Sequence, residues 1–213
     1  MADTDDLSFG DGTDDSPFSI SAWVYMDDAT NFNIAHKGNF SDNIEWRFFL
    51  DHWDKIKFLC GDNSAGSVNA WVGRLHETSL TSYEGEWIHL VGTYDGSSAN
   101  SGFKIYLNKN RIDDTDYSGG AYVAIENLSK PVEIGNYSGN YSDGSIDEIA
   151  IYNKTLSLSE ISDLYGGGTP LTCGDMTEID GLIAGYRFEE GRGTTTSDIT
   201  GNDNDGTLIN GVS

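Results

Sequence analysis

Basic residues are scarce in this chain of 213 residues. Twelve Lys and Arg stand against 35 Asp and Glu, so the formal net charge at pH 7 is −23. A surface of that sign repels phosphate backbones and anionic lipids, which argues against nucleic acid as a partner and against binding to a membrane surface. Two interpretations of the acidity stay open. It keeps the protein soluble, or some carboxylates gather to bind calcium, which prefers about six to eight oxygen ligands.

Long apolar runs are missing as well. No stretch approaches the roughly 18 apolar residues of a membrane span, and the acidic first residues, Met-Ala-Asp-Thr-Asp-Asp, lack the apolar segment of a signal peptide. We expect an extracellular location or a virion surface, with the chain part of a longer protein or exported by another route. Cysteine is rare, and Cys60 and Cys173 fit no zinc motif. One disulfide and two separate thiols are both compatible with that pair.

Proline is rare (3), whereas glycine is abundant (26) and aromatic residues make up 12% of the chain. This mixture indicates many strands joined by Gly, Asn, Asp and Ser turns rather than a helical bundle. The clearest strand is 18–26, where Phe18, Ile20, Ala22, Val24 and Met26 alternate with more polar residues and should face a core. Further strands are predicted at 32–36, 45–51, 55–61, 70–75, 87–94, 103–108, 132–136, 145–152, 182–189 and 207–209.

One short helix is predicted after residue 156. Ser157 and Glu160 have the spacing of a capping box, and Gly166 follows the apolar residues Ile161 and Leu164 as a stop signal. Many short strands without βαβ spacing indicate an all-β fold, a sandwich of two antiparallel sheets.

Four phrases in this order resemble the laminin-G-like / concanavalin-A-like lectin-glucanase family, the pentraxin-like jelly rolls. They cover most of residues 7–165 and are Phe18-Ser-Ile-Ser-Ala-Trp-Val, Trp87-Ile-His-Leu-Val-Gly-Thr-Tyr-Asp-Gly, Lys104-Ile-Tyr-Leu-Asn, and Gly144-Ser-Ile-Asp-Glu-Ile-Ala-Ile-Tyr-Asn-Lys-Thr-Leu-Ser. The resemblance implies a jelly-roll β-sandwich. It does not imply one ligand, because such a fold carries many functions.

The order of segments departs from that family. Residues 181–191 and 198–208 look like the start of such a domain but stand at the end of this chain, whereas 7–15 look like the segment that normally follows them. We therefore expect one domain over 1–213, either circularly permuted or cut from a tandem array, with a main body at 7–165, a linker at 166–180 and the family's N-terminal strands at 181–213. Residues 182–189 should lie beside the strand that holds Ile146 to Ile151, within the chain or by strand exchange and self-association.

Catalytic motifs are not evident. Glycosidases of the family resembled carry a Glu-x-Asp-x-(x)-Glu strand, and no Glu of this chain has that spacing. Asp147 and Glu148 are adjacent, so in a strand they point to opposite faces. No Gly-x-Ser-x-Gly motif is present. We expect no enzymatic activity, with a glycan-active hydrolase or lyase as the less favoured reading.

The resemblance also implies a calcium ion between the first strand and the strand near the chain end. Asp147 matches one side, and the oxygen-rich turn from residue 198 to 205 is its best partner. The predicted ligands of this structural calcium are Asp147, Asp198, Asn202, Asp203 and Asp205. In the alternative interpretation, Asp and Asn build left-handed and Asx turns there.

Aromatic residues beside polar ones suggest a sugar site, because sugars stack on rings while polar groups orient their hydroxyls. Trp53 lies in a predicted hairpin turn, where packing does not explain an indole, whereas Trp46 shares parity with Phe48 and Leu50 and is expected in the core. Trp23 and Trp87 are also expected to pack. The predicted ligand-binding residues are Trp53, Trp71, Arg74, Tyr137 and Tyr141.

These observations favour a non-catalytic carbohydrate-binding or adhesion module whose partner is a carbohydrate or cell-surface glycan. The alternative from another class is a structural domain, such as a decoration or appendage domain of a virion or cell-surface assembly. An extended apolar face or an exchanged strand would favour that alternative.

Overall fold

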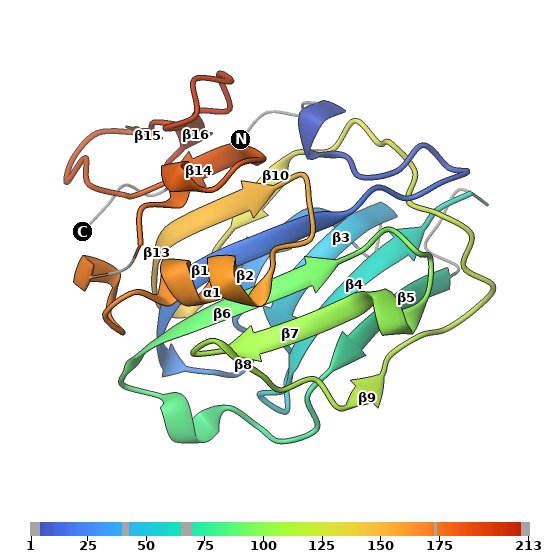
Figure 1. The fold of residues 1–213 in the computed structure, drawn as a ribbon, viewed down its shortest axis with the longest axis horizontal. Helices are drawn as coiled ribbons and strands as arrows, with labels where there is room; N and C mark the ends of the chain where they lie inside the picture. Colours follow the sequence, from blue (N-terminus) through green and yellow to red (C-terminus); the bar gives the residue numbers. More distant parts are fainter. Residues whose placement is uncertain (1–4, 40–42, 65–69, 173, 210–213) are drawn as a thin grey trace.

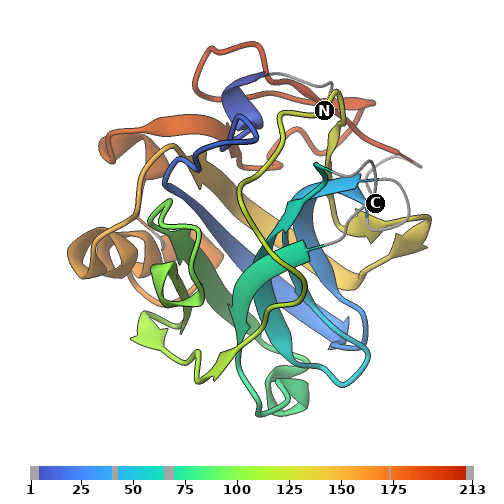
Figure 2. The ribbon, with the colours of Figure 1, turned by 90° about the vertical axis from the view of Figure 1, so that its right-hand side faces the viewer.

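Two six-stranded sheets face each other and form a β-sandwich (Figures 1 and 2). The structure is a computed structural model that describes residues 5–39, 43–64, 70–172 and 174–209. All strand pairs within the two sheets are antiparallel. The predicted all-β sandwich of two antiparallel sheets with one short helix is confirmed.

The strands of the first sheet lie in the order β14-β13-β1-β6-β7-β8, and those of the second in the order β10-β2-β3-β4-β5-β9. The first sheet consists of β1 (Phe18–Asp28), β6 (Trp87–Tyr94), β7 (Phe103–Leu107), β8 (Asn110–Arg111), β13 (Asp143–Tyr152) and β14 (Leu182–Tyr186). The second consists of β2 (Asn33–Asn39), β3 (Asn43–Leu50), β4 (Ile56–Asp62), β5 (Ala70–Leu75), β9 (Thr115–Asp116) and β10 (Val132–Ile134).

Small elements complete the fold. Two ribbons of two strands each are β11 (Asn136–Tyr137) with β12 (Asn140–Tyr141), and β15 (Thr195–Thr196) with β16 (Gly206–Thr207). The α-helix is α1 (Leu158–Tyr165), and single 3-10 turns lie at Asp5–Leu7, Thr81–Tyr83, Asn100–Gly102, Pro170–Thr172 and Met176–Glu178. The predicted linker at 166–180 therefore contains two of these turns. None of the helices in the described part of the chain has the length and apolar character needed to span a bilayer.

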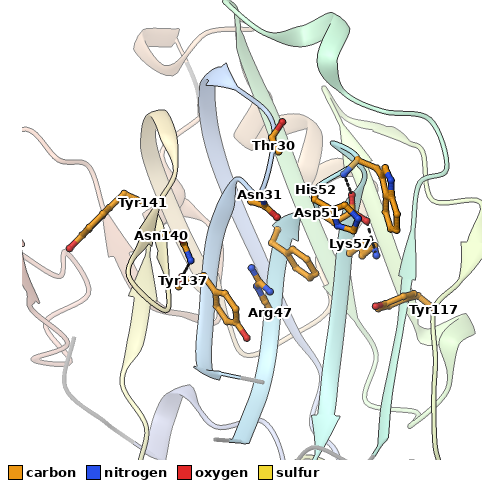
Figure 3. A pocket seen from close by; sticks show the side chains of 12 residues that line it. Thr30, Asn31, Arg47, Asp51, His52, Lys57, Tyr117, Tyr137, Asn140 and Tyr141 are labelled. Atoms are coloured by element: carbon orange, nitrogen blue, oxygen red, sulfur yellow. Dashed lines mark hydrogen bonds and ion pairs between the residues drawn. The ribbon is translucent and has the colours of Figure 1, made fainter. Parts of the chain in front are cut away.

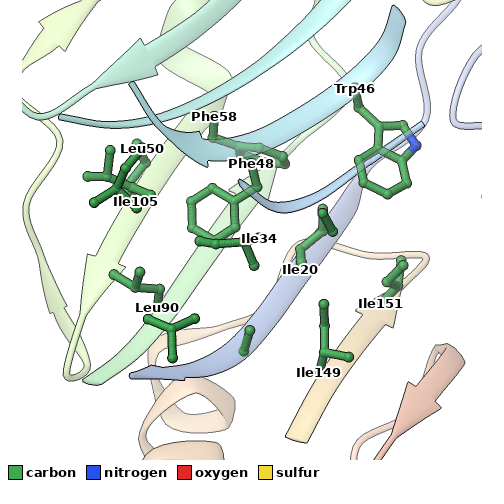
Figure 4. Packing of buried hydrophobic residues seen from close by; sticks show 14 of the residues in the cluster. Ile20, Ile34, Trp46, Phe48, Leu50, Phe58, Leu90, Ile105, Ile149 and Ile151 are labelled. Carbon is green, nitrogen blue, oxygen red and sulfur yellow. The ribbon is translucent and has the colours of Figure 1, made fainter. Parts of the chain in front are cut away.

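Period-two alternation decides which side chains enter the core between the sheets. In β1, the five predicted core residues at 18, 20, 22, 24 and 26 are all buried there. In β3, Trp46, Phe48 and Leu50 are fully buried in the same core, as their shared parity predicts (Figure 4). Because successive strand residues face opposite sides of a sheet, Arg47 and Phe49 lie on the outer face.

The C-terminal strand β14 pairs with β13 in the same chain. Ile149 lies opposite Tyr186, and Ile151 lies opposite Ala184. Ala184 and Tyr186 are buried in the main core, so this late segment completes the sandwich. The predicted pairing of 182–189 with the strand holding Ile146 to Ile151 is confirmed, although β14 ends earlier than predicted. Phe188 has a φ of 49°, which cannot continue a strand.

Helix α1 covers part of the outer face of the first sheet (Figure 1). Its predicted capping box is present, with the Ser157 hydroxyl accepting the Glu160 N–H and the Glu160 carboxylate accepting the Ser157 N–H. Ile161 and Leu164 pack with strand residues in a second apolar cluster, which also contains Val91, Tyr106, Ala150, Tyr152, Leu156, Met176 and Ile179. In the described part of the chain, no α-helix other than α1 is present to cover the outer face of the second sheet.

Whether Cys60 and Cys173 form a disulfide or are two separate thiols stays open. Cys60 is buried in β4 and has no disulfide partner among the described residues. Cys173 lies outside the described residues.

Candidate functional site

A depression of about 630 Å³ lies on the outer face of the second sheet, around the end of β3 and the start of β4. Five aromatic rings line it: Phe49, Trp53, Tyr117, Tyr137 and Tyr141. Between the rings lie Asn31, Arg47, Asp51, His52, Lys57 and Asn140. We call this surface the aromatic groove. Figure 3 shows Tyr137, Asn140 and Tyr141 on one side, His52, Lys57 and Tyr117 on the other, and Arg47 between them.

Strand pairing places the floor of the groove. Arg47 and Phe49 point outward from β3 because their neighbours Trp46, Phe48 and Leu50 fill the core. Phe49 lies opposite Lys57 of β4 in the register, so the two side chains share the outer face. Tyr117 follows the short edge strand β9, and its ring centroid is 4.2 Å from the Lys57 ammonium. The groove floor is therefore a cationic and aromatic surface.

A tight turn after β3 carries one rim of the groove. The Asp51 carboxylate accepts the backbone N–H groups of Trp53 and Lys55 at 2.8 and 3.1 Å, and it pairs with the Lys57 ammonium at 2.8 Å. Burial alone would raise the pKa of Asp51, but the Lys57 ammonium and these donors outweigh it and hold that pKa below its ordinary value. The turn leaves the Trp53 side chain 61% exposed, with its ring 3.5 Å from that of His52.

The hairpin of β11 and β12 carries the opposite rim. Its turn residues Ser138 and Gly139 have φ values of 52° and 83°, the left-handed backbone of a two-residue hairpin turn. The Tyr137 ring lies over the Arg47 guanidinium at 3.4 Å and packs edge-on against His36. Tyr141 is 58% exposed at the outer edge. The hairpin thus presents two tyrosine rings to the groove: that of Tyr137 is fixed by its contacts, and that of Tyr141 is exposed to solvent.

Arg47 occupies the centre of the floor. The guanidinium carbon lies 3.7 Å from the ring centroid of Phe49 and 3.4 Å from the ring centroid of Tyr137. Its Nε donates to the Asn33 Oδ1 at 3.0 Å. Burial lowers the pKa of Arg47 to about 10, so the group is charged at neutral pH.

Three of the five sequence-predicted ligand-binding residues meet in this groove: Trp53, Tyr137 and Tyr141. Trp71 and Arg74 lie outside it. The Trp71 ring packs against Gly119, whereas Arg74 pairs with Asp113 at 2.6 Å and with Asp116. The sequence reasoning missed Arg47, Phe49, Lys57 and Tyr117. For Arg47 and Phe49 a signal was present, because their parity in β3 is opposite to that of the core residues.

The predicted calcium turn is built by its own hydrogen bonds. The Asp198 carboxylate accepts the backbone N–H of Gly185, Thr200 and Asn204, and Asp205 accepts the N–H of Asp198. Asn202 donates to the Ile183 carbonyl, and Asp203 has a φ of 61°. Such an arrangement favours the Asx-turn interpretation, because the Asp198 oxygens already accept donors.

Asp147 lies in β13 and accepts the N–H of Glu148, and burial raises the pKa of Asp147. In the described part of the chain, no group of three or more His, Cys, Asp and Glu side chains gathers as metal ligands would. The residues do not fit a calcium site as arranged, and calcium binding stays a prediction.

Comparison with known proteins places the fold. A laminin G family model, described as the concanavalin A-like lectin/glucanases superfamily, matches residues 2–162. Among curated proteins, none matches the sequence.

Solved structures are similar in fold at low sequence identity. A candidate carbohydrate-binding protein from Bacteroides ovatus is 15% identical with a TM-score of 0.53, and the match covers 93% of this chain and 55% of that one. Domain 4 of a GH43 extracellular arabinanase from Geobacillus stearothermophilus, solved with arabinotriose, is 19% identical with a TM-score of 0.53. The match covers 74% of this chain and 68% of that one. The binding domain of botulinum neurotoxin serotype G is 15% identical with a TM-score of 0.51, and the match covers 77% of this chain and 39% of that one. This chain therefore spans about half of the Bacteroides protein.

Proposed function

Because this chain belongs to the concanavalin A-like lectin/glucanase superfamily, we propose that it is a non-catalytic module that binds an oligosaccharide in the aromatic groove. The main support for this proposal is that two exposed aromatic side chains flank the groove on the outer face of the second sheet. Trp53 lies on one rim and Tyr141 on the other, and each is more than half exposed. Exposed rings around a polar floor suit sugars, whose C–H faces stack while their hydroxyls accept and donate hydrogen bonds.

The chemistry of the groove supports binding without catalysis. Glycoside hydrolysis generally needs two carboxyl groups flanking the bond to be cleaved. Asp51 is the one carboxylate among the described groove residues, and it is engaged by Lys57 and two backbone N–H groups. The side-chain amides of Asn31 and Asn140 also line the groove, and an amide orients hydroxyls but does not transfer protons readily.

The similar structures support a carbohydrate partner. One of them is a candidate carbohydrate-binding protein, and another was solved with arabinotriose. As part of the same proposal, the protein acts at an extracellular location or on a virion surface, where it would meet glycans.

The test is a glycan-array screen of the folded protein, in calcium and again in EDTA. We expect binding to one class of glycan. Trp53→Ala should weaken it roughly thirty-fold, because loss of an anchoring Trp costs about 2 kcal/mol. Leu171→Ala is the matched control, since Leu171 is 94% exposed and outside the groove.

Each outcome has a separate meaning. No binding by a folded protein would contradict the proposal and favour the structural alternative. Binding that survives Trp53→Ala together with Tyr117→Ala would place the sugar elsewhere. Equal binding in EDTA would contradict a calcium ion at the sugar site.

A further inference from the structure

We propose that the aromatic groove selects an acidic sugar, whose carboxylate pairs with the Arg47 guanidinium. This inference rests on the proposed function and names the class of sugar. It concerns an oligosaccharide with an isolated carboxylate, such as a single uronic acid residue among neutral sugars.

The first observation is that Arg47 has no acidic partner among the residues that the structure describes. Three Lys and Arg side chains are buried in the described part of the chain: Lys37, Arg47 and Lys57. Lys37 lies 3.5 Å from the Glu45 carboxylate and Lys57 lies 2.8 Å from that of Asp51. No ion pair joins Arg47 to a described carboxylate, although the chain holds 35 acidic residues. A buried charge without a counterion is costly, so the site is poised for an anion.

The second observation is the orientation of the guanidinium. The rings of Phe49 and Tyr137 hold it by contacts of 3.7 and 3.4 Å, and its Nε is used by Asn33. No hydrogen bond from the two terminal nitrogens to another described residue is present. Arg47 lines the groove while only 8% exposed. A fixed fork of N–H donors in a partly desolvated site matches a carboxylate, which it binds through two parallel hydrogen bonds.

Two carboxylates on elements around the groove, those of Asp51 and Glu133, are engaged by other groups. Asp51 is held by Lys57 and two backbone N–H groups. Glu133 accepts a hydrogen bond from the Asn136 amide at 2.7 Å and lies 3.4 Å from the His36 ring nitrogen. Neither one neutralises Arg47, so a ligand carboxylate would not have to displace a partner.

The total charge of the molecule limits the class of ligand. At −23 the chain repels a long polyanion. At physiological ionic strength, interactions between exposed charges are screened beyond about 8 Å, so an isolated carboxylate beside Arg47 is governed by the local cations instead. This favours a sugar with one carboxylate over a densely charged polysaccharide.

The test uses pairs of probes that differ in one charge. Glucuronic acid- and galacturonic acid-containing oligosaccharides, each with one carboxyl group, are titrated calorimetrically beside their methyl esters and their neutral backbones. We expect the free acid of at least one pair to bind about tenfold or more tightly than its ester, because hydrogen bonds from a guanidinium to a charged carboxylate are stronger than those to a neutral ester. The preference should shrink as salt is added.

Variants then assign the preference to Arg47. Arg47→Gln should abolish it and Arg47→Lys should retain part of it, since Lys keeps the charge but lacks the fork. The matched control is Arg192→Gln, which removes one positive charge from an exposed residue outside the groove. The comparison of acid with ester uses the unaltered protein, so it stands even where an Arg47 variant does not fold.

The failures are distinguishable. Equal binding of acid and ester, or a preference that Arg47→Gln leaves intact, overturns the acidic-sugar inference. Binding of neutral glycans alone, lost in Trp53→Ala, also overturns it but leaves the proposed function standing. No binding of any glycan overturns both.

Discussion

At the scale of single residues, burial and partners decide what a side chain does more than its type. His89 illustrates this on the side of the molecule away from the groove. It is buried in β6, with Nε2 2.8 Å from the Ser21 hydroxyl and its ring beside that of Trp23. Burial lowers the pKa of His89 to about 3, so the imidazole is neutral in the folded protein at neutral pH.

His89 should therefore make stability depend on pH. In the unfolded chain a histidine titrates near pH 6.5, so between pH 6.5 and about 3 the unfolded state alone takes up this proton. The contribution of neutral His89 to the free energy of unfolding is complete above about pH 6.5. It decreases as the pH falls below that value, by about 1.4 kcal/mol per pH unit. We expect wild type to lose about 2 kcal/mol relative to His89→Gln between pH 7 and pH 5, in urea unfolding at both pH values.

The difference between the two proteins isolates His89. Glu148 lines the same small cavity as Ser21 and His89, and burial raises the pKa of Glu148 to about 7, which acts in the opposite direction. Because Glu148 is present in both proteins, its effect largely cancels. Parallel stability curves from pH 7 to pH 5 would contradict the assignment.

Single residues of the site were only partly predictable from the sequence. Trp53 could be found because a tryptophan in a polar turn has no packing role. For Arg47 the strand pattern gave the outward face but not the neighbours, because Tyr137 reaches it from 90 residues away in the chain. Arg74 was predicted from the sequence as a ligand-binding residue, but in the structure its guanidinium forms ion pairs with Asp113 and Asp116.

At the scale of elements, the long strands were predictable and the short ones were not. Strands such as β1 and β6 carry enough alternating residues to show a period of two. The two-residue strands β11 and β12 have no period, and their pairing depends on the turn between them. The sequence therefore predicted Tyr137 and Tyr141 as ligand-binding residues but not the hairpin that carries them.

The turn of that hairpin can be tested by itself. A Cβ added at Gly139 meets no atom within 4 Å, so Gly139→Ala costs only the left-handed backbone at a φ of 83°, about 1–2 kcal/mol. We expect weaker glycan binding, because Tyr137 and Tyr141 shift, with a melting temperature within a few degrees of wild type. Gly191→Ala is the control, since Gly191 also has a positive φ, 60°, and open space. Equal loss of binding in both variants would contradict a local role of the hairpin.

At the scale of the whole molecule, the late strand β14 belongs to the main core. The Tyr186 ring is 1% exposed, stacks near Phe188 and donates its hydroxyl proton to the Asn204 carbonyl. Tyr186→Ala should lower the unfolding free energy by about 3–5 kcal/mol, the usual cost of emptying a large aromatic site. Scanning calorimetry should show a single transition moved to lower temperature. A main transition left in place beside a new, separate one would mean that residues 181–209 fold independently.

The two sheet faces differ in one further way. Helix α1 and its apolar cluster occupy the outer side of the first sheet, whereas the groove opens on the outer side of the second. With the aromatic groove as the proposed glycan site, the described part of one copy has one such groove, so one copy would bind one glycan at a time. Agglutination by this chain would require at least two copies joined together, and the gain in avidity would then depend on the spacing of their grooves rather than on any new contact with sugar.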